Sequence, residues 1–396
     1  MDGHLGVKHA IPTLTHYVSQ VKSGEQKHMT ASTAAAQTAR PRRRPSDSGA
    51  IAWLHVHHPL ALYIFKRFLI SVFLVFGVTL ITFILTNLVP ANPVNSILGE
   101  QEANDPEAVA RMEAKLGLDK PLYEQYWLYL VRLVHGDLGE SFLTKQPVAD
   151  DLRRVFPATL ELGGFVFIFT ILFGVLLGLY AALHHRRFGD QLIRVLSLGG
   201  VSIPTFWLGA MCYYFLFYEL GLFPGSGRLD SRITPPPHVT GMYTVDSIIA
   251  GDWATFGNAV WHLCLPALVL ATANLSSLMR FVRSAVLESM NQDYVLAAKA
   301  KGLPSHKVVF GYILRGAAVP ILNRMGLLFA GLITGSVLTE SIFAWNGLGQ
   351  YAFKATMALD LQGIMGVGVI IGVIYIFVNF IVDIITGFVD QRVRIQ

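Results

Sequence analysis

Long blocks without a charged side chain constrain this chain more than any other feature. Four blocks have about 20 residues or more, enough for a helix rising 1.5 Å per residue to cross a hydrocarbon core of about 30 Å. They are Phe68–Val89, Leu162–Leu183, Val195–Tyr218 and Gly363–Val382. Two further blocks are weaker candidates for a membrane span, because Leu263–Met279 is short and Gly316–Thr339 contains Arg324. The pattern predicts about six membrane-spanning helices.

The composition excludes a soluble core built from the same blocks. Hydrophobic residues make up 53% of the chain and charged residues only 14%, whereas soluble domains carry about 25% charged residues. Pro204 and Pro266 fall within blocks, and membrane helices tolerate proline. We therefore predict an all-α membrane protein whose membrane domain is 61–396. The predicted spans are approximately 68–89, 160–183, 195–218, 262–281, 318–340 and 363–386.

The basic residues gather beside particular ends of these spans. Basic side chains near short loops mark the cytoplasmic side of a membrane. Lys66 and Arg67 precede the first span, and Arg186, Arg187 and Arg194 lie between the second and third. The basic residues from Arg280 to Arg315 lie between the fourth and fifth spans, and Arg392 and Arg394 follow the sixth. This bias predicts that both termini and the link 284–317 are cytoplasmic, and that the loops 90–157 and 219–262 face outward. It also explains the net charge of +5 without a nucleic acid partner.

Residues 1–60 differ from the rest of the chain. The segment is low in complexity, rich in arginine and without an apolar period, which predicts a disordered basic cytoplasmic tail. A transit peptide and a true start at Met29 are alternatives. A metal site at His55, His57 and His58 is less favoured than a solvated tail, since no carboxylate or cysteine has matching spacing.

Both outward loops contain short helical patterns. Apolar and aromatic residues recur at helical spacing from Leu122 to Val134, and Gly136–Gly139 ends the pattern. In the second loop, Pro235–Pro237 predicts an extended segment, followed by a short helix near Val245–Ile249. The first helix could lie on the bilayer surface, form the rim of a substrate entrance, or do both.

The segment Asp293–Pro304 has the signals of a short, capped helix. Asp293 is expected to be its N-cap and Gly302 to supply a left-handed residue after its end. Pro304 would prevent the helix from continuing. Ala297, Ala298 and Ala300 leave the helix slim enough to enter a groove on another protein, although an ordinary surface connector has the same signals.

This segment resembles the coupling motif of permeases from binding-protein-dependent ATP-binding-cassette (ABC) importers, Glu-Ala-Ala followed after three residues by glycine. Leu296 replaces the glutamate here. The peptide branch has a version close to Asp-Tyr-x3-Ala-x-Ala-Lys-Gly-Leu. Its matching positions are Asp293, Tyr294, Ala298, Ala300, Lys301, Gly302 and Leu303.

The resemblance extends from about Lys66 to Arg394 and is closest to the B-type subunit of dipeptide and oligopeptide permeases. Its other motifs include Leu116–Leu122, Gly136–Ser141, Leu338–Phe343 and Gly347–Gly349. It implies a type I, MetI-like permease fold with a substantial outer loop between the first two helices. The implied location is the cytoplasmic (inner) membrane of a prokaryote.

The resemblance also implies partners. They are a second, related permease, two cytoplasmic ATPase subunits that bind ATP and Mg²⁺, and an extracytoplasmic peptide-binding protein. This chain would bind no cofactor or metal and would not be an enzyme. Gly311-x4-Gly316 resembles a phosphate-binding loop only in outline, because Ala317 stands where lysine is required.

Polar residues within or near spans are candidates for a substrate path or for contact with the binding protein. They are Glu161, Asn274 and Glu340. Asn379 and Asp383 share a face of the last helix, and for Asp383 interhelical hydrogen bonding is favoured over a functional role.

Other functions stay open. Nickel chelates and glutathione are carried by similar permeases and are alternative substrates. A membrane enzyme is the rival from another class, but it would need a nucleophile and base at matching depth. Ser336 and His262 are the nearest candidates, and the motif around Ser336 is incomplete.

Overall fold

The computed structural model describes residues 59–88, 105–116, 120–335 and 337–389. The chain divides into two units, Met1–Leu62 and Tyr63–Gln396, and nearly all the described residues belong to the second. Apart from its last two residues, the predicted tail 1–60 lies outside the described residues, as does Ser336. The described residues form helices, with one isolated β-bridge between Glu140 and Pro147.

Within the described part of the chain, five helical runs are long and apolar enough to cross a membrane, or six if one bent pair is counted as a span. This agrees with the prediction of about six spans. The long elements are α3 (Pro59–Leu88), α7 (Val148–Leu183), α8 (Phe188–Ser202), α9 (Thr205–Cys212) with the π-helical turn η1 (Tyr213–Glu219), α11 (Trp253–Met290), α14 (Leu314–Gly335) and α17 (Leu361–Val389).

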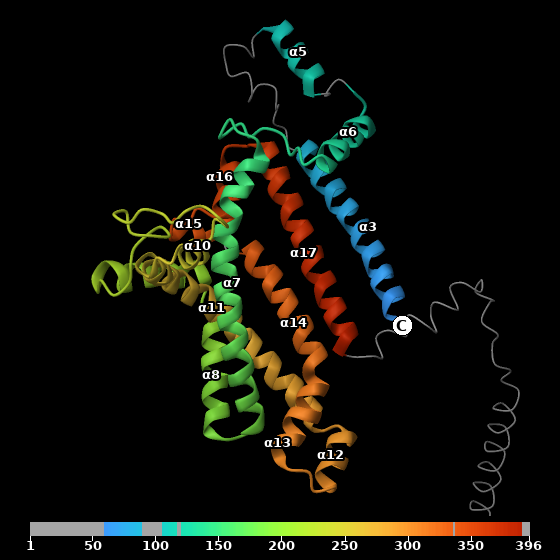
Figure 1. Cartoon of the computed structure of the whole chain (residues 1–396), viewed down its shortest axis with the longest axis vertical. Helices are drawn as coiled ribbons and strands as arrows, with labels where there is room; N and C mark the ends of the chain where they lie inside the picture. Colours follow the sequence, from blue (N-terminus) through green and yellow to red (C-terminus); the bar gives the residue numbers. More distant parts are fainter. Residues whose placement is uncertain (1–58, 89–104, 117–119, 336, 390–396) are drawn as a thin grey trace, which may run out of the picture. The chain divides into compact units, whose positions relative to one another are not determined.

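The remaining elements are short and lie toward the ends of these helices (Figure 1). They are α5 (Pro106–Leu116), α6 (Leu122–Val134), α10 (Tyr243–Ala250), α12 (Asp293–Ala300), α13 (Ser305–Val308), η2 (Val309–Ile313), α15 (Val337–Ile342) and α16 (Leu348–Met357). The helix predicted from Leu122 is confirmed as α6, and the one near Val245–Ile249 as α10.

The third predicted span, 195–218, is not one straight helix. α8 and α9 meet at an angle of 94° around Ile203 and Pro204. Proline has no N–H to donate, and its ring clashes with the preceding turn, so it ends or kinks a helix. Pro266 is accommodated inside α11. The expectation that a helix continues through proline was therefore right for Pro266 and wrong for Pro204.

The helices also extend beyond the apolar blocks. α7 begins at Val148 instead of 160, so the last ten residues of the predicted outer loop 90–157 are helical. α11 runs from Trp253 to Met290 instead of 262–281. Asp150 and Asp151 lie in the first turn of α7, where a negative charge is favourable. The apolar blocks mark only the part of each helix that needs an apolar environment.

Helices α7 and α11 pack along each other at the centre of this unit, and α11 also contacts α8 and α14. Glycines permit the close approach. A Cβ on Gly178 of α7 would lie 2.8 Å from the Met279 carbonyl oxygen and 2.8 Å from Val282 Cβ on α11. Such small-residue contacts are typical of membrane helix pairs.

Helix α3 is joined to α17 by polar contacts. Arg67 pairs with Asp383 at 3.1 Å, and the Tyr63 hydroxyl donates to the Asp383 carbonyl oxygen at 3.3 Å. The Asn379 amide donates to Tyr375 of its own helix. Asp383 therefore has the interhelical contact that was favoured for it.

Figure 1 shows α6 and α16 at one end of the long helices, which is called the α16 end below. It shows α12, α13 and the α7–α8 turn at the other end, which is called the α12 end.

Candidate functional site

At the α12 end, the capping of α12 differs in part from the prediction. Gln292 is the N-cap, without a side-chain hydrogen bond, and Asp293 is the first helical residue. The expected N-cap was therefore wrong by one residue, although a carboxylate in the first turn still favours the helix dipole. Gly302 has φ +72°, which confirms the left-handed residue, and Pro304 precedes α13 as its N-cap.

The two faces of α12 have different surroundings. Val295 is 0% exposed and Ala298 3% exposed, and both pack in the same core cluster as Val308 and Ile313. Ala298 therefore faces its own chain, and of the three alanines only Ala297 and Ala300 are exposed to a partner. The docking role expected for this segment stays a prediction. The exposed residues of α12 are Asp293, Tyr294, Leu296, Ala297, Lys299 and Ala300, and the next residue, Lys301, is exposed as well. Leu303, just beyond the helix, is half-buried against the core cluster.

Polar contacts lock α12 to the long helices. The Ser289 hydroxyl of α11 donates to the Ile313 carbonyl oxygen at 2.8 Å and lies 3.1 Å from the Tyr294 hydroxyl. A Cβ on Gly316 of α14 would overlap the Tyr294 hydroxyl, so the absence of a side chain at Gly316 permits this close approach. Tyr294 of α12 thus lies against α11 and against the junction of η2 with α14.

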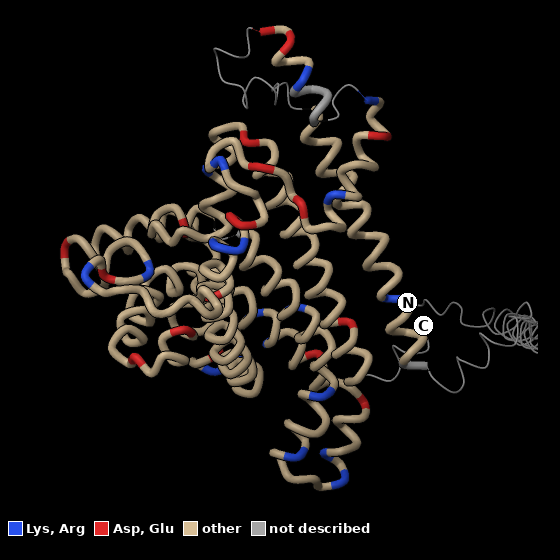
Figure 2. The backbone as a smooth tube through the Cα atoms, turned by 45° about the horizontal axis from the view of Figure 1, so that its top comes forward, with Lys and Arg blue, Asp and Glu red and all other residues tan. Residues whose placement is uncertain are grey.

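An ion pair fixes the neighbouring turn. Arg283 of α11 donates from Nε to Asp190 Oδ1 at 2.6 Å and from its terminal nitrogen to Oδ2 at 2.9 Å. The Asp190 side chain, on α8, is 1% exposed. Bidentate pairs of this kind are strong and geometrically specific. The α12 end is also rich in Lys and Arg around the α12–α13 turn, as Figure 2 shows.

Glu161 lies on α7 toward the α16 end and is already bound by this chain. Its carboxylate accepts hydrogen bonds from Arg228 at 2.6 Å and from the backbone and hydroxyl of Thr244, both at 2.7 Å. The Arg228 guanidinium also stacks over the Tyr243 ring at 3.8 Å. Glu161 thus fastens the segment 219–250 to α7, and its contact with a substrate or receptor stays a prediction.

Glu340 occupies a similar position on α15. It is 0% exposed and accepts hydrogen bonds from the Thr159 hydroxyl at 2.7 Å and the Gln350 backbone at 3.0 Å. The Thr159 oxygen in turn accepts from the Leu348 backbone at 2.7 Å. Glu340 therefore joins α7, α15 and α16, and its role as a contact for a partner also stays a prediction.

The segment before α10 is organised around Asp246. Its buried carboxylate accepts from the Thr240 backbone and hydroxyl, both at 2.7 Å, and from the Gly241 backbone at 2.9 Å. Burial opposes ionisation of this carboxyl group, but the hydrogen bonds prevail and lower its pKa. The segment is thus held on α10 by a charged carboxylate.

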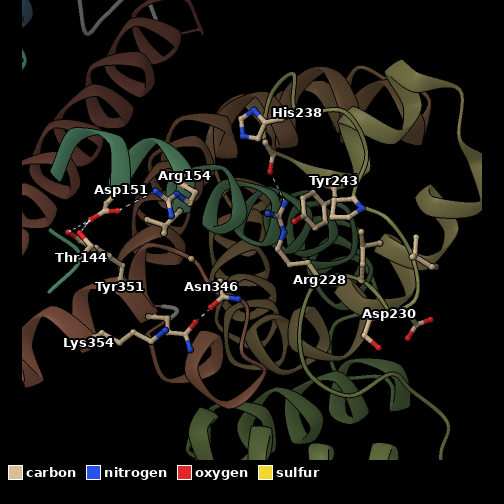
Figure 3. A pocket seen from close by; sticks show the side chains of 18 of the residues that line it. Thr144, Asp151, Arg154, Arg228, Asp230, His238, Tyr243, Asn346, Tyr351 and Lys354 are labelled. Carbon is tan, nitrogen blue, oxygen red and sulfur yellow. Dashed lines mark hydrogen bonds and ion pairs between the residues drawn. The ribbon is translucent and has the colours of Figure 1, made fainter. Parts of the chain in front are cut away.

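A cavity of about 700 Å³ opens between α7, α16 and the segment 228–243 (Figure 3). Arg154, Arg228 and Lys354 line it together with Asp151 and Tyr351. Burial is the main reason that the pKa of Tyr351 rises to about 12, so its hydroxyl keeps its proton and donates to Asp151 at 3.4 Å. The cavity was not predicted from the sequence, because its walls come from three distant segments.

His262, the candidate base of an enzyme, is buried in a structural contact. Its ring nitrogens lie 3.1 Å from the Gly227 carbonyl oxygen and 3.3 Å from Asp230 Oδ1. The partners orient the ring toward the segment before α10. Its contacts among the described residues therefore account for this histidine without catalysis.

Asn274 lies on α11 beside a second cavity of about 320 Å³. Its amide donates to the Leu270 carbonyl oxygen at 2.7 Å. Thr205 and Arg324 line the same cavity. Asn274 was a candidate site residue from the sequence. Arg324 was not, and its single charge within an apolar block was the only signal that could have identified it.

The long apolar helices are those of a multi-pass membrane protein. The chain belongs to the family of binding-protein-dependent transport system inner membrane components, whose model matches residues 174–395, while the model of the family's N-terminal region matches 60–163. The resemblance seen in the sequence and the all-α permease fold are thereby confirmed.

Curated relatives cover most of the chain. The probable D,D-dipeptide transport system permease protein DdpB of Escherichia coli K12 is 40% identical over 81% of this chain and 94% of its own length. The di/tripeptide transport system permease protein DppB of Pseudomonas aeruginosa is 41% identical over 81% and 95%. The dipeptide transport system permease protein DppB of Haemophilus influenzae is 40% identical over 84% and 99%.

Proposed function

We propose that this chain is one permease subunit of an ATP-driven importer of short peptides, and that α12 docks into a partner ATPase. The observation that carries the docking role is the division of α12 into two faces. One face is buried against α11 and η2, while Leu296, Ala297 and Ala300 are exposed and small or apolar. The peptide substrate is supported by the relatives, which are permeases of dipeptide or di/tripeptide transport systems.

The proposed assembly contains a second permease, two ATPase subunits that hold ATP and Mg²⁺, and an extracytoplasmic peptide-binding protein. The ATPases would hydrolyse ATP, and this chain would contribute part of the path. Closure of the ATPases would move α12, and the contacts of Tyr294 and Ser289 would pass the movement to α11 and to η2, which continues into α14. The proposed location is the cytoplasmic membrane of a prokaryote.

The orientation can be tested with single cysteines. We expect Tyr123→Cys on α6 to react with a membrane-impermeant maleimide added to intact cells, and Ser305→Cys to react only after lysis. Both positions are exposed in the structure, and the basic residues at the α12 end are expected to stay in the cytoplasm. Cys212 and Cys264, the two native cysteines, are replaced by alanine, and the unlabelled parent is the control. The reverse labelling pattern would overturn the orientation.

The substrate class can be tested by uptake in cells with and without the gene. Deletion is expected to abolish uptake of labelled di- and tripeptides through this system, and the wild-type gene to restore it. Nickel and glutathione uptake are measured in parallel, because nickel chelates and glutathione are the alternative substrates. Unchanged peptide uptake together with lost nickel or glutathione uptake would assign the importer to that substrate instead.

A further inference from the structure

Arg324 stands near the middle of α14 and faces α11. α14 belongs to the run Ser305–Ile342, which is long and apolar enough to cross a membrane. A guanidinium at such a depth costs free energy unless it is paired or lies beside water, and charged groups in these positions usually serve a function.

The contacts of Arg324 within this chain leave most of its hydrogen-bonding capacity free. Its guanidinium donates to the Ser277 hydroxyl at 2.7 Å, and no carboxylate of the described residues forms an ion pair with it. By contrast, Arg67, Arg228 and Arg283 each pair with an acid. A guanidinium carries five N–H donors, so Arg324 is equipped for an anionic partner that the described residues do not supply.

The surroundings of Arg324 suit a small ligand. The cavity of about 320 Å³ lies between α9, α11 and α14, at the lower end of the range of about 300–1,000 Å³ typical of small-molecule pockets. Its polar side chains are Thr205, Asn274 and Arg324, and leucines make up much of the remaining wall. An apolar wall strengthens the attraction between a guanidinium and an anion.

We propose that Arg324, with Thr205 and Asn274 beside it, binds the C-terminal carboxylate of the peptide as it crosses the membrane. This inference rests on the proposed function. Every linear peptide with a free C-terminus carries this carboxylate whatever its side chains, so one fixed cation can serve many sequences. A guanidinium fits a carboxylate with two parallel hydrogen bonds. The competing occupant is a carboxylate of the second permease.

The test compares two proteins with two peptides. The whole importer, purified through a tag on this chain, is reconstituted in vesicles as wild type and as Arg324→Gln. Uptake of a dipeptide with a free C-terminus and of its C-terminal amide is measured at saturating peptide-loaded binding protein. Any preference of the binding protein cancels, because it is the same in both importers. Arg315→Gln, an exposed arginine at the start of the same helix, is the matched control.

We expect Arg324→Gln to reduce uptake of the free-acid dipeptide about tenfold and uptake of the amide less than about twofold, as loss of one charge-assisted contact predicts. ATP hydrolysis stimulated by the loaded binding protein should persist, which shows that the complex is assembled. If the wild-type importer does not transport the amide, the Arg324→Lys importer provides the test instead. It should keep about a third or more of free-acid uptake, because lysine keeps the positive charge.

Equal losses for both peptides, or loss of stimulated ATP hydrolysis, would assign Arg324 to assembly with the second permease and overturn the proposal. Unchanged free-acid uptake in Arg324→Gln would overturn the proposal as well. If the wild type transports no amide, an inactive Arg324→Lys importer would also overturn it. If the wild type takes up no peptide at all, the proposed function fails and this inference fails with it.

Discussion

Ala297→Asp in α12 is expected to lower peptide uptake by at least about tenfold while the complex still contains this chain in normal amounts. Ala297 is exposed in this structure, so the substitution does not disturb the chain's own core. Docking would bury the new carboxylate against the ATPase without a partner, and an unpaired buried charge is costly. Uptake into membrane vesicles and the amount of purified complex are the two measurements.

Two further variants separate docking from folding. Ala110→Asp places the same charge on an exposed alanine of α5 and should leave uptake unchanged. Ala298→Asp buries a carboxylate within the chain's own core, since Ala298 is 3% exposed, and should lower the amount of protein itself. Wild-type uptake in Ala297→Asp would show that the exposed face of α12 does not dock.

Arg283→Met is expected to destabilise the α12 end strongly. The Asp190 side chain is 1% exposed and the Arg283 side chain 18% exposed, so the variant leaves a buried carboxylate without its guanidinium. Removing one partner of a buried ion pair typically costs about 3–5 kcal/mol. A fall in the thermal denaturation midpoint of the purified complex would report it.

The double variant Arg283→Met with Asp190→Leu should recover much of this loss, because no unpaired charge remains and apolar pairs often replace buried ion pairs without cost. Arg153→Met is the matched control, since Arg153 and Asp150 form an exposed pair with side chains 82% and 52% exposed. Such pairs contribute about 0–1 kcal/mol. A midpoint for Arg283→Met equal to that of the control would contradict the importance of this contact.

Local pattern in the sequence determined the membrane class and many of the elements. The charge-free blocks predicted about six spans, the aromatic period predicted α6, and Gly302 predicted the left-handed residue after α12. Each signal acts through neighbouring residues or through the apolar solvent of the bilayer. The motif around α12 also led to the family, because it depends on residue identity at fixed spacing.

Only the tertiary structure decided which side of each element faces which partner. The burial of Ala298, the hydrogen bonds of Glu340 with Thr159, and the position of Arg324 beside the cavity all arise from residues far apart in the sequence. Pro204 explains why the helix breaks there, but the 94° angle between α8 and α9 is a property of the tertiary structure, in which both helices contact α11. A periodic pattern shows that a helix has distinct faces, but the contacts between helices determine which face is buried, because those contacts depend on the positions of all the neighbouring helices at once.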